Sequence, residues 1–313
     1  MLAEADFTPI YEGEKWDLNP GESYFVIRED TLIAAFTLPK KKPSSTIIIA
    51  THIDSPALKI KPEAHAEPGR LYTEAYGAPL LHTWFDRDLA IAGRIITLSK
   101  NGECESQVVY LDDYPVIIPA LAIHLDRTAN EKGLKIQKQD HLRAMYTLSK
   151  KGKTLIECLH RHHSFKKLLS YDLYLVPIEK AAFPGFESEF ISSYRIDNLS
   201  SAFAALEALL TAKANPGVIQ MAPFWDHEEI GSKTYAGADT TFVTEILERI
   251  SLKYKMNKED LFRLKSRSFC LSCDAAHAFH PNFSDKFDPE NTPHLGKGPA
   301  IKYSPRYLSL IHI

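Results

Sequence analysis

The sequence predicts an α/β fold that is interrupted by an inserted, mostly β domain. Strands rich in Ile, Val and Leu alternate with helices patterned in Ala and Leu, which is typical of an open sheet covered by helices. Between about residues 63 and 170 the pattern changes to short β-like pieces and a Lys- and His-rich stretch. We therefore assign residues 1–62 and 171–313 to one discontinuous α/β domain and residues 63–170 to the insertion.

Length and composition indicate an ordinary globular protein. The 313 residues are 44% apolar and 25% charged, enough for one large domain or two. A net charge of −3 gives no basic surface for nucleic acid or an anionic membrane. No apolar run approaches the roughly 20 residues of a membrane-spanning helix. Four cysteines and no signal peptide before the acidic opening residues favour a soluble protein of the reducing cytoplasm.

Three strands are expected before the insertion, at residues 24–28, 31–37 and 45–50, each apolar or β-branched and ended by turn residues or charges. The third is followed at once by His52 and Asp54. Open α/β sheets bind their ligands at the carboxyl ends of strands. These two residues are therefore the first candidates for a functional site.

The insertion and the region after it have their own expected elements. Short strands are expected at 107–111 and 116–120, and a strand at 172–176 marks the return of the α/β domain. Residues 199–212 carry Ala and Leu at helical spacing. The remaining elements are a strand at 218–225, a helix at about 240–254 and a strand at 268–272.

Carboxylates and one imidazole recur where these elements begin or end. Alone, an acidic residue before a helix would be an ordinary N-cap, and two adjacent glutamates an exposed turn. Together they suit a metal, because zinc takes nitrogen and oxygen ligands and a pair of metals needs a bridging carboxylate. The sequence thus predicts a carboxylate-rich metal site. Its candidates are His52, Asp54, Asp197, Glu228, Glu229 and Asp274.

Six motifs appear in order between residues 51 and 302 and resemble the aspartyl aminopeptidase family, so that the likeness extends over nearly the whole chain. They are THIDSPALKIKP (51–62), TWFDRDLAIAGRI (83–95), RIDNLSSAFAALEAL (195–209), WDHEEIGSKTYAGAD (225–239), SCDAAHAFHPNF (272–283) and DPENTPHLGKGPAIK (288–302). The resemblance implies a dinuclear zinc peptidase with a three-layer, phosphorylase/hydrolase-like domain and an inserted dimerisation domain. It also implies peptide substrates with acidic N-terminal residues, and dimers that assemble into dodecamers.

Matched residue by residue, the resemblance implies a role for each candidate. His52 and Asp274 would bind one zinc, Asp197 would bridge the two zinc ions, and Glu229 would bind the second. Asp54 would accept a hydrogen bond from the other ring nitrogen of His52 and fix its tautomer.

Four further residues have roles implied by the same resemblance. Glu228 would be the general base, taking a proton from the attacking water and delivering it to the leaving amine. His124 would reach into the active site of a partner subunit, unless it is only a strand-end histidine. His277 and Lys302 would lie near the pocket for the N-terminal residue, where donors favour an acidic side chain, unless they are surface charges.

The family's carboxyl-terminal part, with the last histidine ligand of the second zinc, has no counterpart in the sequence, and His312 is not in a matching context. Three alternatives stay open: a working dinuclear aminopeptidase, a truncated remnant that is inactive or weakly active, and a noncatalytic assembly subunit. The presence of Glu228 and Asp54 favours catalysis, since a scaffold needs neither.

Overall fold

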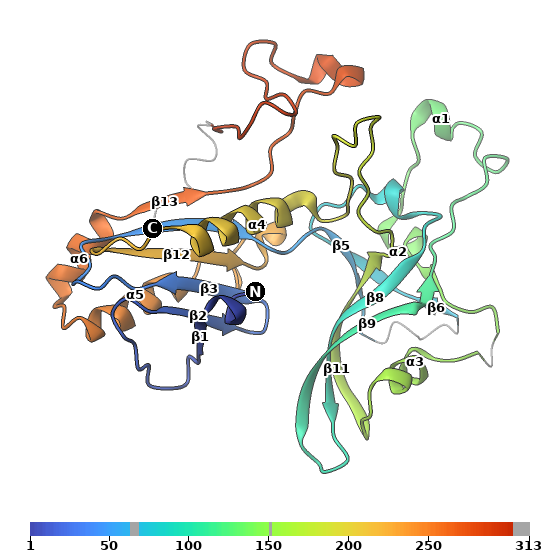
Figure 1. The fold of residues 1–313 in the computed structure, drawn as a ribbon. Helices are drawn as coiled ribbons and strands as arrows, with labels where there is room; N and C mark the ends of the chain where they lie inside the picture. The colour runs from blue at the N-terminus through green and yellow to red at the C-terminus, as the bar shows by residue number, and fades with distance from the viewer. Residues whose placement is uncertain (63–68, 150–151, 303–313) are drawn as a thin grey trace. The chain divides into compact units, whose positions relative to one another are not determined.

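The computed structural model describes residues 1–62, 69–149 and 152–302. The chain forms two compact units (Figure 1). The first contains residues 1–54 and the chain from residue 195 onward, and the second contains residues 55–194. Each unit is built on its own sheet, so the α/β class with a mostly β insertion is confirmed.

A six-stranded mixed sheet forms the centre of the first unit. Strands β12, β4 and β13 run parallel, and β3 is antiparallel to both β12 and β2. The carboxyl ends of the three parallel strands therefore meet at one edge. In sheet order the strands are β1 (Phe7–Ile10), β2 (Ser23–Arg28), β3 (Leu32–Thr37), β12 (Val218–Trp225), β4 (Ser45–His52) and β13 (Phe269–Ser272).

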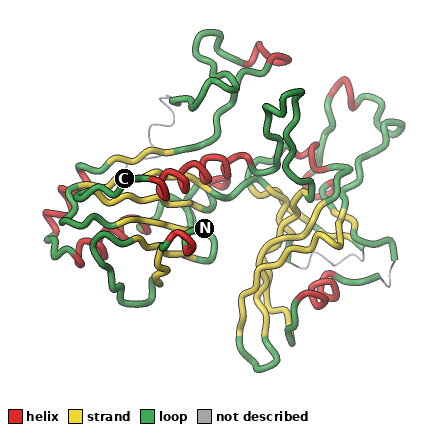
Figure 2. The backbone as a smooth tube through the Cα atoms, in the orientation of Figure 1, coloured by secondary structure: helices red, strands yellow, loops and turns green. Residues whose placement is uncertain are grey.

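Helices cover both faces of this sheet and give three layers (Figure 2). Helix α4 (Ile196–Thr211) packs Ala202 and Ala205 against Phe224 on one face. Helices α5 (Phe242–Lys253) and α6 (Lys258–Ser266) bury their apolar residues on the other. Helix α6, which the sequence pattern did not reveal, begins at a capping box of Asn257 and Asp260. Among the described residues, no helix is long and apolar enough to cross a membrane.

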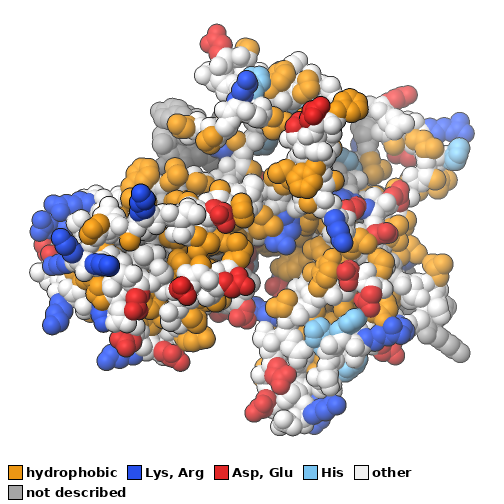
Figure 3. Space-filling view, in the orientation of Figure 1, with side chains coloured by type: hydrophobic (Ala, Val, Ile, Leu, Met, Phe, Trp, Pro, Cys, Tyr) orange, Lys and Arg blue, Asp and Glu red, His pale blue; other side chains and the backbone are white. Residues whose placement is uncertain are grey.

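The second unit contains a five-stranded antiparallel sheet and short helices. In sheet order its strands are β7 (Thr73–Tyr76), β5 (Ala57–Ile60), β11 (Lys167–Pro177), β8 (Leu89–Leu98) and β9 (Cys104–Val116). A small sheet pairs β6 (Arg70–Leu71) with β10 (Ala144–Met145). The helices are α1 (Ala129–Lys132), α2 (Lys138–His141) and α3 (Leu155–His162), and α3 packs Leu155 and Leu159 into the core of this unit. In the face drawn in Figure 3, acidic and basic side chains are interspersed.

Strand β11 corrects the expected return of the α/β domain. A strand does form at 172–176, but it lies between β5 and β8 in the sheet of the second unit. The strand β5, from the segment 1–62, belongs to the same sheet. An apolar run identifies a strand without identifying the strand that it pairs with. The chain passes from one unit to the other between residues 54 and 55 and between residues 194 and 195.

The expected strand at 116–120 does not form as such. Strand β9 ends at Val116, and Ile117 makes only an isolated bridge with Met145. The elements expected at 24–28, 31–37 and 218–225 form as β2, β3 and β12. Strand β4 extends beyond the expected Ala50 and includes His52, which places this histidine in the sheet.

Gly93 in β8 marks a position of the second sheet that excludes a side chain. Its φ is +147°, and a Cβ built there would lie 2.1 Å from the carbonyl oxygen of Asp172 on β11. Glycine is required here both by the backbone conformation and by the close approach of the neighbouring strand.

We expect Gly93→Ala to lower the free energy of unfolding of the second unit by about 1–3 kcal/mol, because β8 must move away from β11. Urea denaturation measures the change. Gly13→Ala is the control, since a Cβ at Gly13 meets nothing within 4 Å. Equal losses in the two variants would contradict the close approach.

Candidate metal centre

His52 occupies the centre of the edge where the parallel strands end. It is the last residue of β4, is 5% exposed, and is in register with Trp225, the last residue of β12. On its other side, Ala50 of β4 is in register with Ser272, the last residue of β13. Parallel pairing therefore delivers the loops after β12 and β13 to the two sides of the imidazole.

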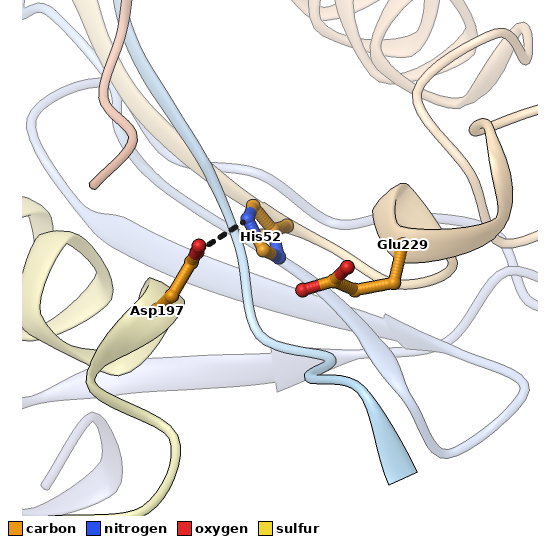
Figure 4. A group of neighbouring side chains, drawn as sticks. All are labelled: His52, Asp197 and Glu229. Atoms are coloured by element: carbon orange, nitrogen blue, oxygen red, sulfur yellow. Dashed lines mark ion pairs between the residues drawn. The ribbon is translucent and has the colours of Figure 1, made fainter. Parts of the chain in front are cut away.

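Three carboxylates face the Nε2 atom of His52. Asp197 Oδ1 lies 3.3 Å away, Asp274 Oδ1 3.5 Å and Glu228 Oε2 3.9 Å. Possible ligand atoms of His52, Asp197 and Glu229 lie within 4.8 Å of one another, and the three side chains converge from different elements (Figure 4). The structure thus brings together five predicted site residues that are far apart in the sequence.

Asp54 lies on the other side of the imidazole. Its Oδ1 is 3.2 Å from the Nδ1 atom of His52. The same carboxylate accepts backbone N–H groups from Glu228 and Glu229, each at 3.1 Å. When Nδ1–H is donated to Asp54, the ring is oriented with Nε2 toward the other carboxylates. Asp54 also fixes the turn that carries both glutamates, a contact that the sequence analysis missed.

Asp197 is not the helix cap that it would be in isolation. The N-cap position of α4 is Arg195, which makes no side-chain capping bond, and Asp197 and Asn198 have non-helical φ and ψ angles. The first turn of α4 is therefore irregular, and the carboxylate of Asp197 reaches His52. The buried Asn198 beside it, which the sequence analysis passed over, hydrogen-bonds to Thr51 and Cys273, the residues that precede His52 and Asp274.

Burial, neighbouring charges and hydrogen bonds shift the pKa values of the site residues. Burial, and then the charge of Asp197, raises the pKa of Glu229 to about 7. Burial also raises the pKa of Glu228 and of Asp197. Burial opposes protonation of His52, yet its bonds with Asp274 and Asp54 raise its pKa to about 10.

The hydrogen bond to His52 lowers the pKa of Asp274 to about 2, and Lys302 adds to this effect. Raised pKa values at His52, Glu229, Glu228 and Asp197 are the response expected where negative charge accumulates in a partly buried site. A divalent cation would compensate the same charge, and the set of one imidazole nitrogen and several carboxylate oxygens is one that zinc accepts. The residues present therefore fit the metal.

The other predicted residues lie in several places. Lys302 Nζ is 3.2 Å from Asp274 Oδ2 and donates to the carbonyl oxygen of Ala275. His277 is exposed on the segment after Asp274. His124 is exposed in the second unit, and His312 lies outside the described residues.

Sequence comparisons identify relatives of the whole chain. Residues 1–309 match the family of aminopeptidase I zinc metalloproteases (M18). A probable M18 family aminopeptidase 2 of Clostridium novyi (strain NT) is 37% identical over 315 residues, which cover 96% of this chain and 72% of that protein. Aspartyl aminopeptidase 1 of Schizosaccharomyces pombe is 37% identical, with 95% and 69% of the two chains covered.

Solved structures agree with these matches. The complex of Ape4 and Nbr1 has a TM-score of 0.85 at 34% identity, covering 95% of this chain and 62% of that one. The "Structure of S. cerevesiae mApe1 dodecamer" has a TM-score of 0.78 at 26% identity, covering 94% and 70%. This chain thus spans 62% to 72% of the lengths of these four proteins. The resemblance seen in the motifs is confirmed, and the chain belongs to the M18 family of zinc metalloprotease aminopeptidases.

Proposed function

We propose that this chain is a zinc aminopeptidase that removes acidic N-terminal residues from peptides. The convergence of His52, Asp197 and Glu229 on one point at the sheet edge carries this proposal. Peptide hydrolysis needs an activated water and a proton carrier, and the half-exposed Glu228 lies beside the convergent residues.

We propose that the site binds two zinc ions, as the resemblance implies, although the last histidine ligand of the second zinc has no counterpart in the sequence. The first would be held by His52 Nε2 and Asp274, which lie 3.5 Å apart. Glu229 would hold the second, and Asp197 is close enough to both groups to serve as the bridge. Zinc supplies Lewis acidity to such a site, polarising a carbonyl and lowering the pKa of water.

Glu228 is suited to move the proton during hydrolysis. It lies at the start of the turn after β12, and its side chain is 46% exposed, so water and substrate can reach it. Its raised pKa brings proton uptake closer to neutral pH. Glu228 would accept a proton from the attacking water and deliver it to the leaving amine, while Asp54 holds its backbone N–H.

Substrate preference and assembly extend this proposal. The Schizosaccharomyces pombe relative is named an aspartyl aminopeptidase, and Lys302 offers a cation beside Asp274, both of which support an acidic N-terminal residue. His277 would add a donor near the same pocket. The mApe1 dodecamer supports self-association, in which His124 of the second unit would serve a partner's site. Four free thiols suit a cytoplasmic location.

We expect Glu228→Gln to lower kcat by about 10²–10⁴-fold, the usual contribution of a general acid–base group, with zinc content unchanged. Hydrolysis of aspartyl and glutamyl p-nitroanilides by the zinc-loaded chain measures the effect. Glu248→Gln is the control, because Glu248 is exposed on α5. Wild-type rates in Glu228→Gln would exclude Glu228 as the base, and an inactive zinc-loaded wild type would favour the remnant or assembly subunit.

Removal of His52 should remove the metal. We expect His52→Ala to lower zinc affinity by more than the roughly 100-fold that loss of an orienting partner costs, because a direct ligand is lost. Metal analysis after dialysis against a weak chelator measures zinc per chain. The exposed His82, changed to Ala, should keep the wild-type content. Equal zinc in both variants would show that the metal is bound elsewhere.

A further inference from the structure

We propose that Asn198 is a positioning residue that holds three of the four ligand-bearing segments of the zinc site, those of His52, Asp197 and Asp274, in one arrangement. This inference rests on the proposed function. Asn198 follows Asp197 directly, and its Nδ2 donates to Thr51 Oγ1 and to the carbonyl oxygen of Cys273, each at 3.0 Å. Thr51 precedes His52, and Cys273 precedes Asp274. One amide group thus connects the residues adjacent to three proposed ligands.

The hydrogen bonds of Asn198 add directional contacts to the apolar packing of α4 on the sheet. The strands β4 and β13 are fixed to each other by their ladder, which the bond from Cys273 N to Ala50 O continues. Helix α4 packs on the sheet through apolar side chains such as Ala202 and Ala205, and apolar contacts have no preferred direction. A metal site tolerates misplacement of its ligands by only about 0.5 Å. The directional bonds of Asn198 meet this requirement.

The carbonyl of Cys273 also fixes the orientation of the amide. Nitrogen and oxygen of an Asn side chain are assigned from their partners. The Thr51 hydroxyl accepts or donates, but a backbone carbonyl only accepts. The NH₂ group must therefore face Cys273. This leaves the buried Oδ1 of Asn198 without a hydrogen-bond partner among the described residues.

That unpaired oxygen indicates a role in the site rather than in stability. Asn198 is 0% exposed, and burial of an unpaired polar atom destabilises the folded state. An apolar residue of similar size would avoid this cost but could not connect the start of α4 to Thr51 and Cys273 by hydrogen bonds. Retention of a polar group at a stability cost is typical of functional sites.

The test compares two variants that break the bonds with two that keep them. We expect Asn198→Ala to lower the zinc affinity of the folded full chain by about 10–100-fold, as loss of a residue that orients ligands does. Thr51→Val keeps the volume and removes the bond from Asn198, together with the 3.4 Å bond that the Thr51 hydroxyl donates to the carbonyl oxygen of His52. The bond from Asn198 to Cys273 remains, so Thr51→Val should lower affinity less, and it tests the inference if Asn198→Ala fails to fold. Thr51→Ser keeps the hydroxyl and should bind zinc as the wild type does.

Ser200→Ala is the matched control in the same helix. Within the described part of the chain, the Ser200 hydroxyl hydrogen-bonds only to the carbonyl oxygen of Ile196. Competition with a chromophoric chelator measures affinity, and thermal unfolding is followed with and without zinc ions. A positioning role predicts that zinc raises the Tm of Asn198→Ala less than that of the wild type.

Each alternative gives a different result. If Asn198 serves stability alone, its loss lowers the Tm equally with and without zinc, and zinc affinity stays at the wild-type value, which overturns the inference and leaves the proposed function intact. A wild-type chain that binds no zinc overturns the proposed function, and the inference with it. Reduced affinity in Asn198→Ala and Thr51→Val, with wild-type affinity in Thr51→Ser and Ser200→Ala, supports the positioning role.

Discussion

At the carboxyl edge of β4, negative charge accumulates around the imidazole of His52. The carboxylates belong to Asp54, Asp197, Glu228, Glu229 and Asp274. Like charges at such distances repel, and burial together with this repulsion raises the pKa of Glu229 to about 7. The arrangement persists only where a rigid frame holds the groups and where protons or a cation offset their charge. The fold of the first unit supplies the frame, and the proposed zinc ions would supply the positive charge that offsets the carboxylates.

Two polar side chains next to ligands complete the frame in complementary ways. Asp54 is an acceptor: its two oxygens take the His52 ring and the backbone N–H groups of Glu228 and Glu229. Asn198 is a donor: its amide joins the ends of β4 and β13 to the start of α4. Both are within two residues of a proposed ligand in sequence. The hydrogen bonds of each residue therefore fix the nearby ligands relative to the strands of the sheet.

The sequence predicted which residues form the site better than it predicted the strand pairing and hydrogen bonds that hold them in place. The Ile-rich run before His52 indicates a buried strand, and carboxylates at strand ends indicate a shared edge. Strand partners are not encoded in such local patterns, which is why β11 was assigned to the wrong sheet. Asn198 was missed for a similar reason. Beside a helix it looks like part of a cap, and its role depends on a carbonyl 75 residues away.

The position of the insertion in the chain raises a physical problem that the second unit itself resolves. This unit begins at Ser55, directly after Asp54, and ends at Tyr194, shortly before Asp197. An insertion with separated ends would pull these two site residues apart. Its ends are instead joined, because the Tyr194 hydroxyl donates to the carbonyl oxygen of Pro56, and Tyr194 packs edge-on against Trp84. An inserted domain is tolerated where its two termini lie close together. The second unit can therefore interrupt the chain between two site residues without stretching the hydrogen bonds that Asp54 and Asn198 make.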